Sequence, residues 1–235
     1  MINANETPAT DFERNLLEAV MEYSMLKHPF YVAWTEGKLS QSVLAEYAKQ
    51  YYAHVRAFPT YVSAVHSHCD DLQIRQELLE NLIEEERGTE NHPELWMRFA
   101  EGLGVAREDV RNTELLPATE NSVARLKALT ASEDYRDGLA ALYAYESQIP
   151  EVARTKREGL KDFYGIDDER AVSFFRVHEG IDVLHQQVEK QILSEKCRTA
   201  DEQSRAVAAA KESAKALWSF LDGVTAEYLP DERSC

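Results

Sequence analysis

The sequence predicts an all-α protein, and three observations support that fold class. Only 9 Gly and 7 Pro occur among 235 residues, which is well below the average share of about 12% for these two helix breakers. Apolar residues recur at spacings of three and four along almost the whole chain, as expected for helices with one buried face. No linker rich in Pro, Gly or Ser interrupts this pattern, so we expect a single helical domain over residues 1–235.

The first half of the chain contains signals for where helices begin and end. Thr10 and the Glu three positions later form the pattern of a capping box, which opens the first helix. His28-Pro29 ends that helix, Ser40 begins a long one, and Pro59 is expected to kink it. Together the signals predict helices over residues 10–27, 30–36, 40–67, 72–86 and 93–101.

The second half begins with residues 104–119, which we interpret as the longest loop. Helical periodicity then continues almost to the end of the chain. Pro150 is expected to kink one of these helices, and Gly165 closes it. The predicted helices cover residues 120–131, 134–163, 168–196 and 200–228.

The charge balance and the cysteines restrict the class of protein. Lys and Arg number 26 against 42 Asp and Glu, a net charge of −16, so we expect neither nucleic acid nor an anionic membrane as a partner. No apolar run is long enough to span a bilayer, and Met1–Thr10 lacks the features of a signal peptide. We therefore expect a cytoplasmic protein. Its three widely spaced cysteines predict reduced thiols rather than disulfides.

The sharpest chemical pattern lies in the helix predicted over residues 168–196. His178, Asp182 and His185 occupy positions i, i+4 and i+7, which place three polar groups on one helix face. That face also carries apolar residues such as Phe174 and Ile181, so the polar groups replace core positions. Burying them without partners would be costly. The pattern therefore indicates either metal ligands or a buried His–Asp hydrogen-bond network.

Two other predicted helices carry carboxylates among apolar neighbours. Glu146 interrupts an apolar stripe, and Glu85 lies seven residues before His92, a spacing that stacks two groups on one face if the helix continues through Gly88. Together with the first set, these residues give three histidines and three carboxylates, which suit two iron or manganese ions with open positions. Helix bundles build di-metal sites in this way, although the Glu-x-x-His pairs of ferritin-like proteins are absent.

Several other residues have an ordinary structural interpretation. A lone inward-facing histidine is more often a hydrogen-bonded core residue than a ligand, and tyrosines at helical spacing are more often core or cavity lining than a cofactor site. The acidic run at residues 84–86 would by default be a solvated face. On these grounds we interpret His54, His66 and His68, and also Tyr47, Tyr51, Tyr143 and Tyr145, as structural.

The complete pattern resembles a known family. Glu85, His92, Glu146 and the His178-x3-Asp182-x2-His185 helix, in a helical chain of this length, resemble the heme-oxygenase-like di-metal oxidases. Within that group the chain is most similar to the para-aminobenzoate-forming relatives of the chlamydial protein associating with death domains. The fold also serves thiaminase-type and pyrroloquinoline-quinone-synthase-type proteins, but a thiaminase nucleophile cysteine is not evident here.

The resemblance implies an unusual chemistry, in which the protein consumes its own side chains to form para-aminobenzoate for folate biosynthesis. The family's sacrificial tyrosine falls on Tyr31 and its amino-donating lysine on Lys156. The implied cofactor is a pair of transition-metal ions, Fe/Fe or Fe/Mn, used with dioxygen and an external reductant. The resemblance also implies a homodimer. On an unbroken helix, however, Lys156 would stand about 15 Å from Glu146 along the axis, so a kink at Pro150 or a long reach is required.

Two alternatives remain open at this point. One is a conventional di-iron oxidase that acts on a bound small molecule, with the tyrosines only lining its cavity. The other is a non-enzymatic helical interaction protein with an acidic surface, which would leave the inward carboxylates and histidines without a purpose.

Overall fold

The structure is a computed structural model that describes residues 10–229, except for the side chains of residues 181–183. The described residues form helices and connecting loops, with no strand among them. None of these helices is long and apolar enough to cross a membrane. The elements are α1 (Asp11–Met21), the 3₁₀ helix η1 (Met25–Lys27), α2 (Pro29–Thr35), α3 (Gln41–His68), α4 (Leu72–Glu86), α5 (His92–Gly102), α6 (Arg107–Arg111), α7 (Pro117–Thr130), α8 (Tyr135–Glu146), α9 (Ile149–Tyr164), α10 (Ser173–Lys196) and α11 (Ala200–Tyr228).

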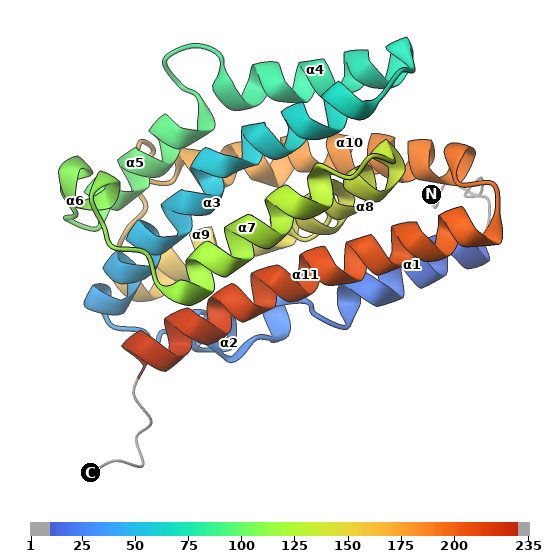
Figure 1. Ribbon diagram of the computed structural model, residues 1–235. Coiled ribbons are helices and arrows are strands. Elements are labelled where there is room, and N and C mark those ends of the chain that lie inside the picture. Colours follow the sequence, from blue (N-terminus) through green and yellow to red (C-terminus); the bar gives the residue numbers. More distant parts are fainter. Residues whose placement is uncertain (1–9, 230–235) are drawn as a thin grey trace, which may run out of the picture.

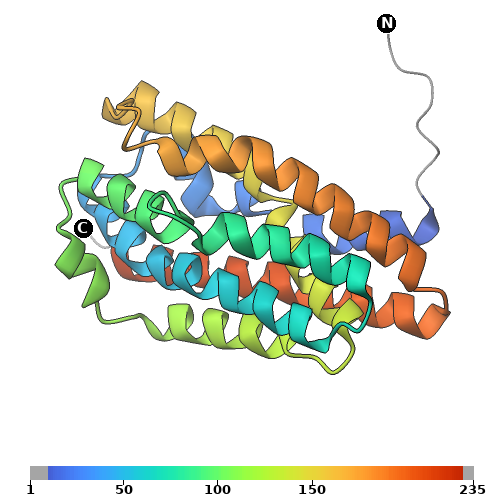
Figure 2. The same cartoon turned by 90° about the horizontal axis from the view of Figure 1, so that it is seen from above.

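The axes of the long helices α3, α7, α10 and α11 are roughly aligned along the molecule, with α11 running in the opposite chain direction to the other three (Figures 1 and 2). Helix α11 packs against α7, α8 and α1, and α10 packs against α8 and α9. Helix α3 contacts α4, α5, α7 and α8, so it lies near the centre of the bundle. The all-α fold class predicted from the sequence is confirmed.

Several helix ends follow the predicted capping chemistry. The side chain of Thr10 accepts a hydrogen bond from the backbone of Glu13, whose carboxylate accepts one from the backbone of Thr10. Ser40 caps α3 and Asp71 caps α4 in the same manner. These bonds satisfy backbone N–H groups that have no partner within their own helix.

Four predicted boundaries were wrong. The first helix ends at Met21, and only the 3₁₀ turn η1 continues it. The expected loop over 104–119 contains α6 and the start of α7, because Pro117 fits the first turn of a helix. The helix expected over 134–163 is two helices, since Pro150 lies in the first turn of α9. The helix expected to begin at 168 begins at Ser173.

The core is rich in aromatic side chains. Trp34, Tyr31, Tyr47 and Trp96 are fully buried and lie in contact between α2, α3 and α5. Helix α2, which carries Tyr31, is fixed at its start by His28. The Nδ1 atom of His28 accepts from the backbone of Phe30, and its Nε2 lies 3.1 Å from Asp222 on α11. The tyrosine is thus held on an element anchored at both the core and α11.

Candidate metal centre

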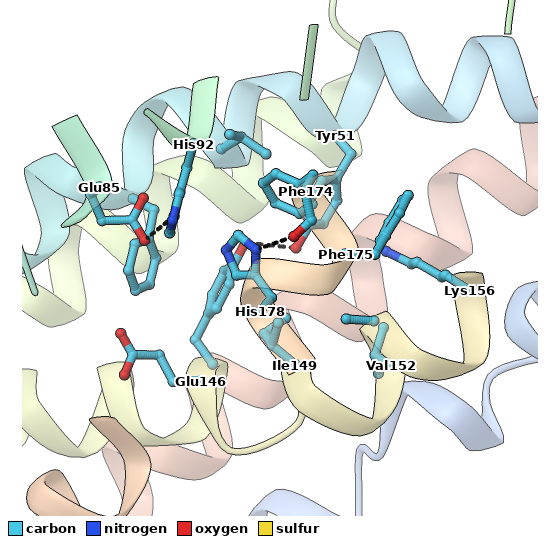
Figure 3. A pocket seen from close by; sticks show the side chains of 14 residues that line it. Tyr51, Glu85, His92, Glu146, Ile149, Val152, Lys156, Phe174, Phe175 and His178 are labelled. Atoms are coloured by element: carbon cyan, nitrogen blue, oxygen red, sulfur yellow. Dashed lines mark hydrogen bonds and ion pairs between the residues drawn. The ribbon is translucent and has the colours of Figure 1, made fainter. Parts of the chain in front are cut away.

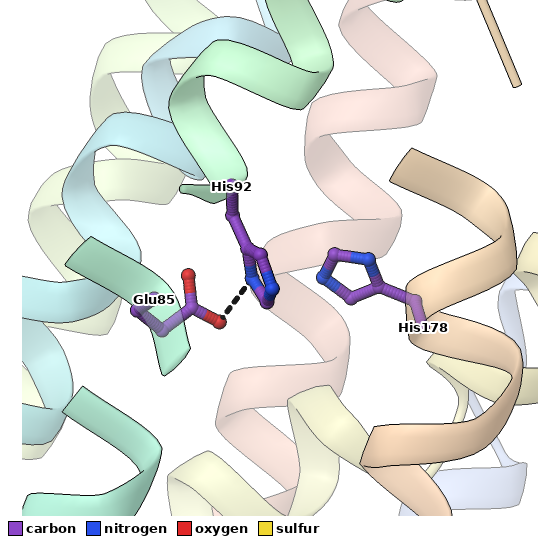
Figure 4. Close-up of side chains that lie close together, drawn as sticks. All are labelled: Glu85, His92 and His178. Atoms are coloured by element: carbon purple, nitrogen blue, oxygen red, sulfur yellow. Dashed lines mark ion pairs between the residues drawn. The ribbon is translucent and has the colours of Figure 1, made fainter. Parts of the chain in front are cut away.

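Three helices bring Glu85, His92 and His178 together, and one potential ligand atom from each lies within 4.8 Å of the others. Figure 4 shows Glu85 from α4, His92 from α5 and His178 from α10 pointing toward one another. All three side chains are buried. The spacing of Glu85 and His92 stacks them on one helix face only if the helix continues through Gly88. That condition is not met, because α4 ends at Glu86 and α5 begins at His92, and the short connection brings the two residues together instead.

The donor chemistry of this cluster suits a transition metal. The Nδ1–H of His178 donates to the carbonyl of Phe174 at 2.7 Å, which leaves Nε2 with a free lone pair. Burial lowers the pKa of His178 well below its usual value, so the ring is neutral. Nδ1 of His92 lies 2.7 Å from Oε1 of Glu85 but has no hydrogen-bond partner. Imidazole nitrogens beside a buried carboxylate are ligands that iron and manganese accept.

Glu146, at the end of α8, lies across from Glu85 in Figure 3. Its Oε1 accepts a hydrogen bond from Nδ2 of Asn81 at 2.8 Å, and its Oε2 lies 3.9 Å from Nδ1 of His185. The Nε2 of His185 in turn lies 2.9 Å from Glu84. Burial, together with the nearby carboxylate of Glu85, raises the pKa of Glu146 to about 8. The side chain of Asp182 lies outside the described residues.

A narrow cavity begins at these residues and ends at Lys156 (Figure 3). Glu85, His92, Glu146 and His178 line one end of the cavity, and its volume is about 30 Å³. Between the two ends the wall is mainly apolar and aromatic, and it includes Val55, Phe58, Val152, Phe174 and Phe175.

Lys156 is buried, although its neighbours in the sequence resemble an exposed basic stretch. Its Nζ donates to the hydroxyl of Tyr47 at 2.6 Å, and that hydroxyl lies 2.9 Å from the hydroxyl of Tyr31. The same Nζ lies 5.0 Å from the ring centre of Tyr31 and 4.8 Å from that of Tyr51. Burial lowers the pKa of Lys156 well below its usual value, so the amine is held neutral.

The break between α8 and α9 explains how Lys156 reaches the cavity that Glu146 also lines. The helix stops at Glu146 and restarts at Ile149, so the two residues do not share one straight axis. The side chain of Gln148 at this break accepts from the backbone of Met25 at 2.8 Å and donates to the carbonyl of Ala144. Pro150 therefore marked the correct position in the chain, but the helix is interrupted there rather than kinked.

Sequence reasoning missed two buried polar residues near Glu146. Asn81 precedes Glu85 by four positions on α4, and Glu189 follows His185 by four positions on α10. Helical spacing from a predicted ligand was the signal that could have found both. The interpretation of His54 as a hydrogen-bonded core residue was wrong in part. The residue is fully buried, but neither ring nitrogen has a partner among the described residues, and burial lowers its pKa to about 3.

The buried histidine–carboxylate cluster is typical of a metal site in a helix bundle, and comparison with known proteins shows the class of the protein. Residues 45–218 match the family described as iron-containing redox enzyme, so the chain belongs to that family and is an oxidoreductase.

Individual relatives sharpen the comparison. The chain is 42% identical to the 4-aminobenzoate synthase of Nitrosomonas europaea over 226 residues, which cover 92% of each chain. It is 42% identical to the 4-aminobenzoate synthase of Chlamydia pneumoniae over 86% of this chain and 89% of that one. Among solved structures, a domain with a heme oxygenase-like fold from Shewanella denitrificans superposes with a TM-score of 0.77 at 23% identity, covering 94% of each chain.

Proposed function

We propose that this chain forms para-aminobenzoate for folate biosynthesis, taking the ring from Tyr31 and the amino nitrogen from Lys156. One observation carries the proposal: a single buried cavity joins a cluster of potential metal ligands to a neutral lysine that lies against Tyr31. The 4-aminobenzoate synthases that are 41–42% identical to this chain support it.

The residues that would hold two transition-metal ions, Fe/Fe or Fe/Mn, are Glu85, His92, Glu146, His178, Asp182 and His185. The donor set fits such ions, because it offers neutral imidazoles and buried carboxylate oxygens, including Oε2 of Glu146, which has no hydrogen-bond partner among the described residues. When bound, the ions would supply the oxidising power of dioxygen, with electrons from an external reductant.

The chain's own groups account for the carbon and nitrogen atoms of the product. A tyrosine side chain already contains a para-substituted ring with one attached carbon. The bond between Cα and Cβ of Tyr31 breaks as dioxygen oxidises Cβ to the carboxylate carbon and supplies its oxygens. Nitrogen from Lys156 replaces the phenolic oxygen, which leaves as water, and oxidative cleavage of the Cε–Nζ bond by dioxygen leaves an aldehyde at Cε of the lysine. The hydroxyl of Tyr47 lies between the two reacting groups and holds both by hydrogen bonds. An amine must be neutral to react as a nucleophile, and burial keeps Lys156 in that form.

The size of the cavity favours an internal source for the ring. A volume of about 30 Å³ is enough for one or two water-sized molecules, whereas a cavity that binds benzene measures roughly 150 Å³. Dioxygen therefore fits between the metal-ligand end and the lysine, but an added aromatic substrate does not fit without rearrangement.

The test is isotopic. Protein expressed with ring-labelled tyrosine, then purified and supplied with Fe(II), Mn(II), a reductant and oxygen, should release labelled para-aminobenzoate, at no more than about one molecule per chain. Unlabelled product, or many turnovers on an added aromatic compound, would replace this proposal with a conventional oxidase.

Tyr31→Phe should stop product formation without lowering metal content, because Tyr31 contacts the lysine and not the metal-ligand cluster. Tyr52→Phe is the matched control, since Tyr52 is on α3 but outside this group of rings, and it should form product as the wild type does.

A further inference from the structure

Two buried side chains near Glu146 have no role in the centre as described so far. Asn81 on α4 and Glu189 on α10 are both only 4% exposed. Asn81 donates to one carboxylate oxygen of Glu146 at 2.8 Å. The carboxyl group of Glu189 lies against that of Glu146. Three side chains from α4, α8 and α10 therefore meet at one buried, oxygen-rich point.

Helix geometry places Glu189 in line with the histidines of α10. It follows His185 by four residues and His178 by eleven, and at ~100° per residue these offsets leave it within about 40° of both. The face that carries His178 and His185 thus continues for one more turn with a carboxylate, and the Glu189 side chain is buried like that of His178.

The polar atoms around Glu146 indicate a missing ligand. Oε2 of Glu146 and Oδ1 of Asn81 are buried, and neither has a hydrogen-bond donor among the described residues. The nearest histidine nitrogen, Nδ1 of His185, is 3.9 Å from Oε2. Two buried carboxyl groups in contact must either share a proton, as Glu189 and Glu146 do without metal, or bind a cation that replaces that proton, and a cation or water bound to it would also satisfy Oδ1 of Asn81.

We propose that Glu189 is a further oxygen ligand of the metal position formed by Glu146 and His185, and that Asn81 is a positioning residue that orients Glu146 toward the ion. The inference rests on the proposed metal centre. It gives the two metal positions different donor sets. Glu85, His92 and His178 form the histidine-rich position, and Glu146, Glu189 and His185, together with the proposed ligand Asp182, form the oxygen-rich position.

The test is titration of the metal-free full-length protein with Mn(II) alone, following unbound Mn(II) by electron paramagnetic resonance. The wild type should bind two ions per chain. Glu189→Gln keeps the shape of the side chain and should bind one ion as the wild type does, with the other weakened at least tenfold, a size typical of lost groups around a metal. Asn81→Ala should weaken the same ion by a smaller factor.

The control is Glu195→Gln. Glu195 lies on the same helix but accepts an exposed hydrogen bond from Gln191, so this variant should bind both ions normally. Two ions bound with wild-type affinity by a folded Glu189→Gln chain would overturn the proposal. If that variant does not fold, Glu189→Met provides the test, because it removes the carboxylate but keeps a side chain of similar length, and wild-type binding by Glu189→Met would equally contradict the role.

A wild-type chain that binds no Mn(II) would overturn the metal centre and the proposed function together. If the wild type binds Mn(II) and only the expected loss in the Glu189 variants is missing, the proposed function still stands, since it is tested independently by the release of labelled para-aminobenzoate.

Discussion

The two ends of the cavity differ in whether their buried polar groups have hydrogen-bond partners. At the metal-ligand end, Nδ1 of His92 and Oε2 of Glu146 are buried without hydrogen-bond partners among the described residues. At the lysine end, Nζ of Lys156 donates to Tyr47, whose hydroxyl also bonds to Tyr31, and six aromatic rings lie within 6 Å of that nitrogen.

The difference shows which part of the molecule depends on a ligand. Helices α4, α5, α8 and α10 each contribute separate side chains to one end, and, within the described part of the chain, polar atoms of those side chains are left unsatisfied where a cation could bind. The other end is complete without added groups, because packing and burial alone keep the amine neutral. Variants at one end should therefore leave the properties of the other end unchanged.

The largest expected effect is that of His178→Ala. The variant should lose most of the metal bound at the histidine-rich position and all product formation, because one of three converging ligands is gone. Metal analysis of purified protein measures the first effect and product release the second. His68→Ala, at an exposed position near the end of α3, is the control and should retain both. Full metal occupancy in His178→Ala would contradict the role of His178 as a ligand and the dependence of this end of the cavity on a bound metal.

Lys156→Met should abolish product but keep the metal content of the wild type. It should also raise stability at neutral pH, because folding no longer requires the amine to lose its proton. The pKa of Lys156 is lowered by burial, so the unfolded chain binds one more proton and the wild type gains stability as pH rises toward 10. The advantage of the variant should shrink over that range, by up to about 1.4 kcal/mol per pH unit. Urea unfolding from pH 7 to 10 measures it.

Glu146→Gln should show the opposite dependence on pH when metal is absent. Burial raises the pKa of Glu146 to about 8, so the folded state holds a proton that the unfolded state releases. Wild-type stability from this group is present below pH ~4.5 and is lost as pH rises toward 8, by up to about 1.4 kcal/mol per unit. The Glu146→Gln variant does not lose this stability as pH rises, because its side chain does not titrate. Urea unfolding with a chelator at pH 6 and pH 8 provides the comparison, and an unchanged difference between the two chains would contradict it.

The smallest effects come from two glycines. A Cβ at Gly159 would lie 2.7 Å from the Trp34 ring beside the lysine, so Gly159→Ala should destabilise the chain by about 1–3 kcal/mol. Gly180, on α10 near the metal-ligand end, has open space at the same position. Gly180→Ala should therefore be neutral or stabilising by about 0.5–1 kcal/mol. Thermal unfolding of both chains tests whether packing is tighter at the lysine end.

Much of the fold and part of the site could be predicted from sequence because they follow helical periodicity. The burial of His178 followed from its place on an apolar stripe, and capping at Thr10 followed from local side-chain chemistry. The meeting of Glu85 with His92 depends on how α5 turns back after α4, and no local pattern encodes that turn. Lys156 and Tyr31 were identified only by resemblance, since their burial depends on packing between distant helices.

The complete burial of Tyr31 has a consequence for the lifetime of the protein. Its ring packs against Phe30, Trp34 and Tyr47 and is 1% exposed. If the ring is released as proposed, the chain keeps a hole in its aromatic core, and emptying a core site of this size costs about 3–5 kcal/mol. Net stabilities of folded domains are only about 5–15 kcal/mol. A spent copy should therefore unfold more readily than a fresh one, so that used molecules become the preferred substrates of cellular proteases.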